Sequence, residues 1–339
     1  MIIAKILENA LGQHACRQFP FFRLTFGFHI FSMVSPRIIF MGTPEFAVAS
    51  LDAICKAGLQ VVAVVTAPDR PAGRGMKLTE SAVKRYAISQ GLDILQPLKL
   101  KDPEFLEALR AYRADLQVVV AFRMLPERVW NMPPMGTINL HGSLLPKYRG
   151  AAPINWAIIN GEKETGVTTF KLKHEIDTGD ILCQERFDIG PDETAGELHD
   201  RMKEIGARVL VETIRGLVGG TIHETPQTIM PDQQPVQAPK LFTEHCRIDW
   251  ARPAREVHDL IRGLSPVPGA FTILNGKMLK IHRSLVEQET PTVDPGMPET
   301  DGKRFLRFAC TDGYLSVLEL QAEGKKRMGV EDFLRGFHL

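Results

Sequence analysis

Two polar residues lie at the carboxyl end of one expected strand, where open α/β sheets place their ligands. Asn139 and His141 are two positions apart, and because side chains alternate faces along a strand, both should point the same way. Ile138 and Leu140 would then pack on the opposite face. An amide and an imidazole placed together can donate N–H groups to an oxygen that gains negative charge. A strand that merely ends in two polar residues near solvent is the competing interpretation.

A carboxylate farther along the chain could complete this group. Asp177 lies in the turn-like sequence Asp-Thr-Gly-Asp, far from His141 along the chain, so the two residues can meet only through the fold. Asp-Thr-Gly is also ordinary turn chemistry, since Asp bonds to its own backbone and Gly tolerates positive φ. Spacing alone therefore supports a plain turn and a catalytic carboxylate about equally.

The bulk composition is that of a globular protein with two domains. A chain of 339 residues is too long for one compact core, and its 44% hydrophobic and 24% charged residues are ordinary for a soluble protein. A net charge of +1 does not indicate a nucleic-acid binder, although a local basic patch can lie within a neutral total. The five cysteines form no CxxC pair, which argues against a metal site and favours free thiols in the cytoplasm.

Apolar runs alternate with helical segments in the first part of the chain. Such a pattern predicts an α/β domain with a mostly parallel, Rossmann-like sheet covered on both faces. The absence of a GxGxxG motif gives a dinucleotide site little support. The expected strands are 37–42, 61–66, 116–121, 137–141, 167–172 and 181–187, and the expected helices are 44–57, 81–90, 103–112, 154–159 and 194–217.

The rest of the chain predicts a linker and a smaller second domain. Four prolines between residues 225 and 239 are typical of an interdomain linker. Beyond it, a helix at 254–263 precedes short strands at 270–274, 278–284, 305–310 and 314–321, which predicts a small β-barrel of the OB-like kind. The expected divisions are a catalytic domain at 34–222, a linker at 223–239 and a C-terminal domain at 240–339.

Residues 1–33 differ in texture from the rest of the chain. They are rich in Phe and Ile, but Arg23 and His29 interrupt the apolar run, so it suits neither a transmembrane helix nor a secretory signal. We interpret them as a disordered leader or a start codon assigned too early. A targeting peptide is the alternative.

Four segments of the sequence resemble one enzyme family. IIFMGTPEFA, APDRPAGRGMKL, NLHGSLLPKYRGAAPINWAI and DTGDIL occur in the order found in methionyl-tRNA formyltransferases, a branch of the folate-dependent formyltransferases. The resemblance runs from about residue 37 to the C-terminus. Sugar-nucleotide formyltransferases and hydrolase-type relatives share the Asn-x-His, Ser-Leu-Leu-Pro and Asp-x-Gly-Asp core. This core therefore indicates a folate-dependent formyltransferase but distinguishes less well between the branches of that group.

The resemblance implies a catalytic role for Asn139, His141 and Asp177. It implies that the enzyme moves a formyl group from 10-formyltetrahydrofolate to the amino group of methionyl initiator tRNA for translation initiation. Asn139 and His141 would hold the oxyanion, while Asp177 would orient His141 and accept a proton from the attacking ammonium. The chemistry requires no metal and no covalent formyl-enzyme.

The resemblance also implies where folate binds. The family's folate pocket follows the loop of Ser143, Leu144, Leu145 and Pro146. A second expected contact region follows the strand at 116–121 and comprises Phe122, Arg123 and Leu125. Here the chain departs from the commonest pattern, and Phe-Arg-Met-Leu looks more like the glycinamide ribonucleotide relatives. Arg123 could pair with the folate glutamate or lie on the surface.

Two basic segments are the expected tRNA contacts. A Gly- and Pro-rich loop contains Arg70, Arg74 and Lys77, and the resemblance implies that Arg74 probes the acceptor end. The C-terminal domain adds Lys325, Lys326 and Arg327. Cations such as these are suited to phosphate contacts, although a solvated loop or face is the simpler interpretation of each segment alone.

Three other functions remain open on the sequence alone. The nearest is formylation of an amino sugar nucleotide, against which the basic loop argues. A 10-formyltetrahydrofolate hydrolase domain would usually continue into further modules that this chain lacks. A non-catalytic tRNA-binding protein would not need the three polar residues. We expect a cytoplasmic monomer that binds folate and tRNA and does not interact with membranes.

Overall fold

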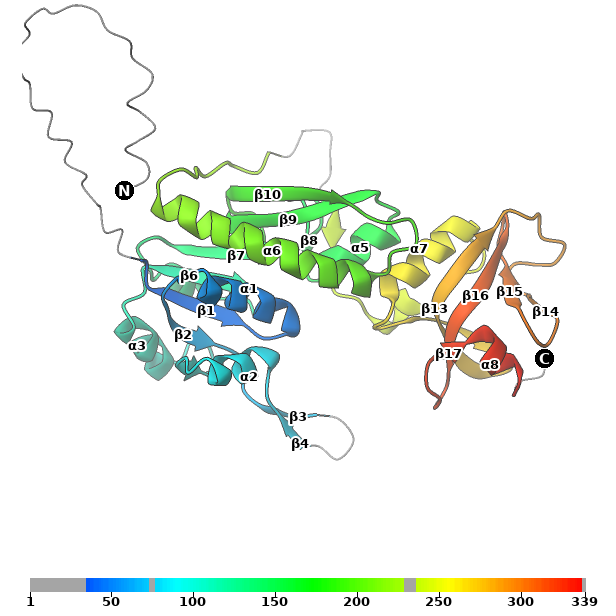
Figure 1. Ribbon diagram of the computed structural model, residues 1–339. Helices are drawn as coiled ribbons and strands as arrows, with labels where there is room; N and C mark the ends of the chain where they lie inside the picture. Colours follow the sequence, from blue (N-terminus) through cyan, green and yellow to red (C-terminus); the bar gives the residue numbers. More distant parts are fainter. Residues whose placement is uncertain (1–34, 73–76, 229–235, 337–339) are drawn as a thin grey trace, which may run out of the picture. The chain divides into compact units, whose positions relative to one another are not determined.

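A twisted, mostly parallel sheet forms the centre of the N-terminal domain (Figure 1). The structure is a computed structural model that describes residues 35–72, 77–228 and 236–336, so the expected leader lies outside the described residues. The sheet has the order β10-β9-β7-β6-β1-β2-β5, with β9 antiparallel to both of its neighbours and the strands from β7 to β5 parallel. Its strands are β1 (Ile38–Gly42), β2 (Val61–Val65), β5 (Ile94–Leu95), β6 (Leu116–Val120), β7 (Thr137–His141), β9 (Glu164–Lys171) and β10 (Ile181–Asp188). The predicted sheet is confirmed.

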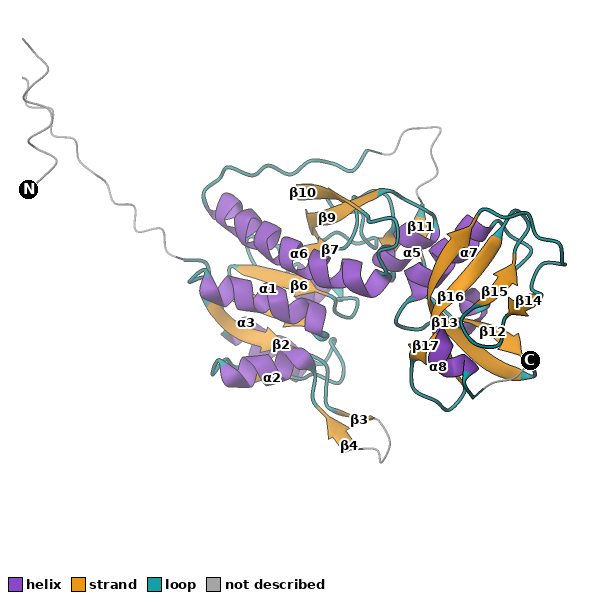
Figure 2. Cartoon of the chain, turned by 45° about the vertical axis from the view of Figure 1, so that its right-hand side comes forward, coloured by secondary structure: helices purple, strands orange, loops and turns teal. Residues whose placement is uncertain are grey.

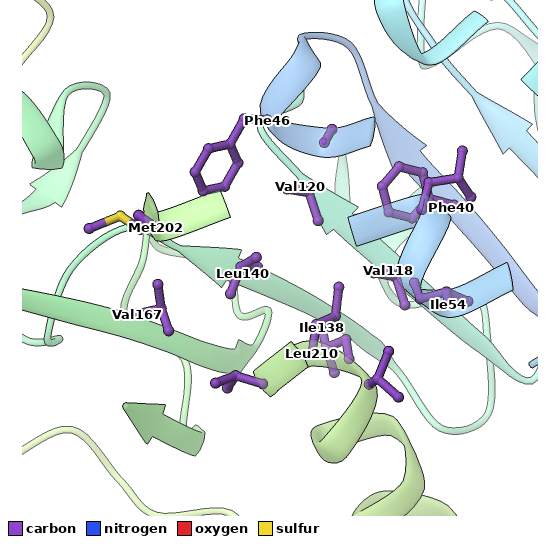
Figure 3. Packing of buried hydrophobic residues seen from close by; sticks show 14 of the residues in the cluster. Phe40, Phe46, Ile54, Val118, Val120, Ile138, Leu140, Val167, Met202 and Leu210 are labelled. Atoms are coloured by element: carbon purple, nitrogen blue, oxygen red, sulfur yellow. The ribbon is translucent and has the colours of Figure 1, made fainter. Parts of the chain in front are cut away.

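The strands at the centre of this sheet are apolar on both faces, as a covered parallel sheet requires. Ile38 and Phe40 of β1 belong to one buried cluster, whereas Ile39 and Met41 belong to the cluster on the other face. Figure 3 shows the first cluster, in which Phe40 lies near Val118 of β6. Burial of each such side chain stabilises the fold by about 1.5–3 kcal/mol.

Helices cover both faces of the sheet. One cluster takes its helical members from α1 (Glu45–Lys56), α2 (Ala82–Ser89), α5 (Pro153–Ile159) and α6 (Ala195–Val218). The other takes them from α3 (Pro103–Ala111) and α4 (Glu127–Trp130). The long α6 begins where predicted because Thr194 and Glu197 form a capping box.

A short hairpin, which the sequence indicated only as a loop, follows β2. Strand β3 (Arg70–Ala72) pairs with β4 (Lys77–Thr79), and Figure 2 shows it projecting from the domain. Its base is fixed by Asp69, whose carboxylate lies 2.5 Å from Lys84 Nζ and accepts a hydrogen bond of 2.8 Å from Gln96. The hairpin thus leaves the sheet from a fixed base.

Part of the expected linker is built into the catalytic domain. Strand β11 (Gln237–Ala238) pairs in parallel with β8 (Arg149–Gly150). Gly150 has φ 127, and a Cβ at this position would lie 2.4 Å from the carbonyl oxygen of Ala238, so only glycine allows this pairing. The pairing brings residues 237–238 against the loop that follows β7.

The C-terminal domain is an antiparallel half-barrel. Its sheet has the order β12-β13-β16-β15-β14, with β17 beside β16, and α7 packs its apolar face onto the sheet's core. Arg247 forms an isolated parallel bridge with Phe271 of β12. The elements are η1 (Thr243–Cys246), α7 (Ala254–Leu264), β12 (Ala270–Leu274), β13 (Lys277–Glu287), β14 (Pro298–Thr300), β15 (Leu306–Ala309), β16 (Tyr314–Ala322), β17 (Met328–Gly329) and α8 (Val330–Leu334). Among the residues that the structure describes, no helix has both the length and the apolar character needed to cross a membrane.

Candidate active site

A cavity of about 710 Å³ opens at the carboxyl ends of β6 and β7. Open α/β sheets bind their ligands at this edge, and the volume is in the range of small-molecule sites. The loops after β6, β7 and β9 supply most of its wall. Residues that line it include Val119, Phe122, Arg123, Met124, Leu125, Trp130, Asn139, His141, Gly150, Asn155, Leu172, Ile176 and Asp177.

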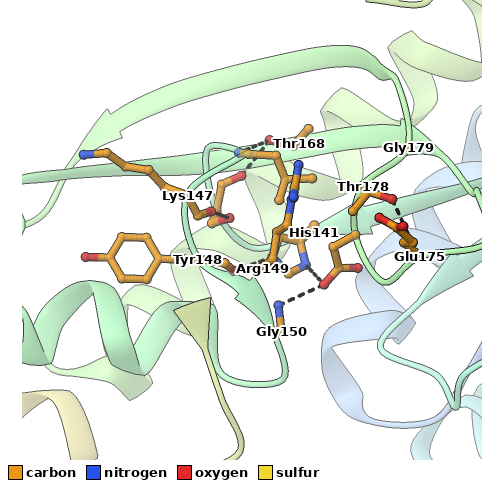
Figure 4. Close-up of polar contacts among 12 residues, drawn as sticks. His141, Lys147, Tyr148, Arg149, Gly150, Thr168, Glu175, Thr178 and Gly179 are labelled. Carbon is orange, nitrogen blue, oxygen red and sulfur yellow. Dashed lines mark hydrogen bonds and ion pairs between the residues drawn. The ribbon is translucent and has the colours of Figure 1, made fainter. Parts of the chain in front are cut away.

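The three expected catalytic residues meet in this cavity. Asn139 and His141 occupy alternate positions of β7, and Asp177 reaches them from the turn that joins β9 to β10. His141 Nδ1 lies 3.8 Å from Asp177 Oδ2. Figure 4 shows His141 near Gly150. Sequence spacing alone could not show whether Asp177 lies near Asn139 and His141, and the fold brings the three together.

The imidazole of His141 is oriented by a backbone carbonyl. Its Nε2 lies 2.8 Å from the oxygen of Tyr148, and because a carbonyl can only accept, Nε2 carries the proton. Nδ1 therefore faces Asp177 over a distance that exceeds a hydrogen bond. The carbonyl of Tyr148 is thus the hydrogen-bond partner that holds the ring on one side, and Asp177 lies beside its other nitrogen. His141 is only 6% exposed.

Asp177 is both a turn residue and a cavity residue. Its φ of 53 places it in the left-handed region, which Asp tolerates better than most residues. Its Oδ2 accepts a hydrogen bond of 2.9 Å from the amide of Gly150. Gly179, two residues later, passes so close to Lys171 that a Cβ would lie 1.6 Å from its carbonyl oxygen. Asp177 is therefore a turn residue whose carboxylate also lines the cavity.

A residue of the expected linker stabilises this turn. Gln227 Nε2 donates hydrogen bonds to the carbonyl oxygens of Asp177 (2.9 Å) and Gly179 (2.7 Å). Its Oε1 accepts from Arg149 Nη2 at 2.6 Å. Sequence reasoning missed Gln227, because a glutamine among prolines gives no signal of a catalytic neighbour.

The structure separates the two groups of expected folate contacts. Phe122, Arg123 and Leu125 line the cavity together with the three polar residues. The loop of Ser143, Leu144, Leu145 and Pro146 is absent from the cavity lining that the described residues form. It is held inward instead: Ser143 is fully buried and donates to the carbonyl of Lys147 at 2.7 Å, and the amide of Leu145 donates to Thr168 Oγ1.

Arg123 is part of the cavity wall and not a free surface cation. Its guanidinium donates to the carbonyl oxygens of Pro97 and Leu98, at 2.9 and 3.2 Å. Burial, and then the nearby charge of Arg70, lower the pKa of Arg123. A cation held beside another cation offers a place for an anionic group of a ligand.

The expected tRNA contacts belong to two separate segments. Arg70 is exposed at the start of the β3–β4 hairpin; Arg74 and the side chain of Lys77 lie outside the described residues. Lys325 and Lys326 are exposed in the turn between β16 and β17. Arg327 forms an ion pair with Glu319, which leaves it less available than its two neighbours.

The fold and the cavity together define a class of enzyme. The formyl transferase family matches residues 36–214, and the family's C-terminal domain matches residues 240–338. The chain is a formyl transferase with the N-terminal and C-terminal domains of that class.

Curated relatives identify the branch. The chain is 52% identical to the methionyl-tRNA formyltransferase of Bacteroides fragilis over 309 residues, which is 89% of this chain and 95% of the relative. It is also 52% identical to that of Porphyromonas gingivalis strain W83 over 312 residues, covering 89% and 96%. The chain therefore belongs to the methionyl-tRNA formyltransferase family.

Solved structures share the fold at lower identity. The sugar 3N-formyl transferase WlaRD, crystallised with dTDP and 5-N-formyl-THF, is 20% identical with a TM-score of 0.62, covering 86% of this chain and 99% of its own. The N-formyltransferase of Helicobacter canadensis, in complex with folinic acid and dTDP-3-aminofucose, is 20% identical with a TM-score of 0.63, covering 86% and 100%. At this identity the likeness concerns the fold alone.

Proposed function

We propose that this chain transfers the formyl group of 10-formyltetrahydrofolate to the α-amino group of methionyl initiator tRNA, for translation initiation in the cytoplasm. The observation that carries the proposal is the meeting of Asn139, His141 and Asp177 in one cavity with an apolar wall. Relatives about half identical over most of the chain bear the name of this activity.

The cavity has the chemistry that a reduced folate requires. Phe122, Leu125 and Trp130 offer apolar surface for flat rings, and Arg123 offers a cation. Ala121, whose φ is 46, lines the cavity at the end of β6, and we assign its backbone to the polar edge of the folate ring. When bound, the folate supplies the activated formyl carbon. The two solved neighbours named above were crystallised with formyl-folates, in line with this assignment.

The polar residues divide the chemical work in this proposal. Asn139 donates its amide N–H to the formyl oxygen as negative charge develops there. Asp177 takes the proton that the ammonium must lose before its nitrogen can attack. His141 Nδ1 and Asp177 Oδ2 lie 3.8 Å apart, so an amine or a water between them would be within hydrogen-bond reach of both.

Proton movement completes the transfer. The new bond joins the substrate nitrogen to the formyl carbon, and the bond from that carbon to the folate nitrogen breaks. The leaving nitrogen must gain a proton while the attacking one loses one. His141 Nδ1 lies within one water molecule of the Asp177 carboxylate, so these two residues can pass that proton across the site.

Two basic segments provide the proposed tRNA contacts. We assign Arg70, Arg74 and Lys77 to the acceptor arm. Strand β3, which begins at Arg70, follows β2 at the same edge of the sheet as the cavity. Lys325 and Lys326 are assigned to phosphates farther away. We keep Ser143, Leu144, Leu145 and Pro146 in the proposed folate site because they directly follow His141 and Gly142, which line the cavity.

Two assays with labelled 10-formyltetrahydrofolate test the proposal. Methionyl initiator tRNA should accept the label, and a dTDP-linked amino sugar should not. The sugar arm matters because both solved neighbours named above are sugar formyltransferases or hold an amino sugar nucleotide. Label found only in the sugar would show that the proposed substrate is wrong, while the roles proposed for Asn139, His141 and Asp177 would still stand.

A further inference from the structure

A second cavity adjoins the active-site cavity. It has a volume of about 790 Å³, and its wall comes from the segment before α3, from α4 with the residues that precede it, and from the turn after β9. The two cavities share the lining residues Arg123, Met124, Leu125, Trp130 and His174. The second cavity is also lined by Leu100, Lys101, Pro126, Glu127 and Arg128. A ligand that fills the active-site cavity and continues past the shared residues enters the second one.

Cations outnumber carboxylates in the lining of the second cavity. Among the described residues that form it, Lys101, Arg123 and Arg128 are cationic, and Glu127 is the one acid. Lys101 and Arg128 are exposed, and in the part of the chain that the structure describes neither side chain forms an ion pair or a hydrogen bond. A concave surface with an excess of one charge attracts ligands of the opposite charge.

Apolar side chains accompany these charges. Leu100 and Leu125 are almost fully buried, whereas Met124 leaves 73% of its surface exposed, and all three line the second cavity. Methylene groups of a ligand can be withdrawn from water on such a surface. The lining therefore suits a flexible acid that carries methylene groups better than a small inorganic ion.

Arg123 is a fixed cation where the two cavities adjoin. Its guanidinium donates to the carbonyl oxygens of Pro97 and Leu98, and its side chain lines both cavities. An acidic group at the end of a ligand in the active-site cavity would find this cation on its way out. Further acidic groups of the same ligand would then meet Lys101 and Arg128 in the second cavity.

We propose that the second cavity binds a tail of γ-linked glutamates attached to the folate. This inference rests on the folate part of the proposed function and extends it. A folate ends in one glutamate, and an amide bond from the side-chain carboxyl of that glutamate to the amine of another lengthens the molecule without changing its rings. Each added residue brings two methylene groups and one more negative charge. Phosphates of tRNA are the competing ligand, but the residues shared with the proposed folate cavity favour the glutamate tail.

Folates with tails of two lengths test the inference by binding alone. Isothermal titration calorimetry without tRNA would compare 10-formyltetrahydrofolate that carries one glutamate with the same folate carrying three. The wild-type enzyme should bind the longer form more tightly by roughly 2- to 30-fold, which is the combined effect of two exposed ion pairs. This advantage should shrink as salt rises, because salt screens exposed charges.

Substitutions in the lining should change the advantage in opposite directions. Lys101→Gln and Arg128→Gln should each remove part of it, while Kd for the short folate stays within about twofold of wild type. The double variant with Lys101→Glu and Arg128→Glu should abolish it. Glu127→Gln takes away the acid of the lining and should enlarge it. Lys163→Gln is the matched control, because Lys163 is exposed and is not among the described residues that line either cavity.

Three results would count against the inference. Equal Kd values for the two folates with wild type, or a full advantage in the double variant, would overturn it. Kinetics with the short folate addresses the competing ligand, because KM for methionyl-tRNA should not change in Lys101→Gln. A rise in that KM, with the preference for the longer folate intact, would assign the second cavity to tRNA phosphates. A wild-type enzyme that binds neither folate would instead refute the proposed function itself.

Discussion

The amide of Gly150 and the carboxylate of Asp177 are joined by a hydrogen bond of 2.9 Å. The bond fixes Asp177 Oδ2 on the side of the cavity where His141 Nδ1 lies 3.8 Å away. Gly150 is itself fixed by the pairing of β8 with β11. The geometry of the proposed catalytic residues His141 and Asp177 therefore depends on backbone groups of β8 and β11.

The proposed division of labour predicts losses in kcat. His141→Ala and Asp177→Asn should each lower kcat by about 10²–10³, the usual cost of removing a group that acts on charge in the transition state. Folate Kd, measured by fluorescence titration, should change little. Asp188→Asn, an exposed carboxylate on β10, is the matched control. A kcat near that of wild type would remove the residue concerned from the catalytic set.

Gln227 should act as a positioning residue. Gln227→Leu removes two hydrogen bonds to the turn that holds Asp177, each worth about 0.5–1.5 kcal/mol, so kcat should fall several-fold. Gln227→Glu keeps the acceptor for Arg149 but places a carboxylate against the carbonyl oxygens of the turn, and it should be worse than Leu. The pH profile of kcat should shift in both variants, because the surroundings of Asp177 change. Equal kcat and an unshifted profile in all three proteins would contradict this role.

Burial of His258 should lower the free energy of unfolding as the pH falls. Desolvation, followed by the charges of Arg255 and Arg262, lowers the pKa of this ring, whose Nδ1 lies 3.0 Å from Ser284 Oγ. Above the ordinary histidine pKa of about 6.5 the ring is neutral in both states. As pH falls below that value the unfolded chain takes up a proton that the folded chain refuses, so the free energy of unfolding falls.

Thermal unfolding at two pH values tests this linkage. The drop in Tm between about pH 7.5 and pH 5.5, a window chosen around the ordinary histidine pKa, should be smaller in His258→Gln than in wild type. His223→Gln, at an exposed position, should keep the wild-type drop. An unchanged drop in His258→Gln would mean that other groups govern the acid response.

Lys325 and Lys326 should contribute to tRNA affinity through phosphate contacts. Lys325→Glu and Lys326→Glu should each weaken tRNA binding, and the weakening should shrink as salt rises, because phosphate contacts release counterions. Each substitution should also lower the salt slope of log Kd by about one. Lys163→Glu, an exposed position of the catalytic domain, makes the same change in net charge and should have a smaller effect. Equal losses in all three variants would indicate only a general charge effect.

Local pattern predicted the first half of the site. The alternation of Asn139 and His141 with Ile138 and Leu140 identified β7 with its observed bounds, because a strand's period of two is a property of neighbouring residues. The same local logic located α6, where the Thr194 capping box marks the start. Both predictions needed no knowledge of distant contacts.

The remaining geometry of the site depends on backbone groups, which the residue types do not indicate. The carbonyl of Tyr148 and the amide of Gly150 set the geometry of His141 and Asp177, and every residue has such groups. Strands β8 and β11 have two residues each, too few for any periodicity. Gln227 reaches the turn of Asp177 only because the segment that resembled a linker by its prolines passes back over that turn.

Formyl transfer by the wild-type enzyme and by Asp177→Asn is the most direct test of the central claim. Both proteins would be assayed with labelled 10-formyltetrahydrofolate and saturating methionyl initiator tRNA, and the product would be identified as formyl-methionine after release from the tRNA. The account predicts label on the methionine amino group with wild type, and a rate lower by about 10²-fold or more with Asp177→Asn. No label on methionine with wild type, or equal rates for the two proteins, would contradict it.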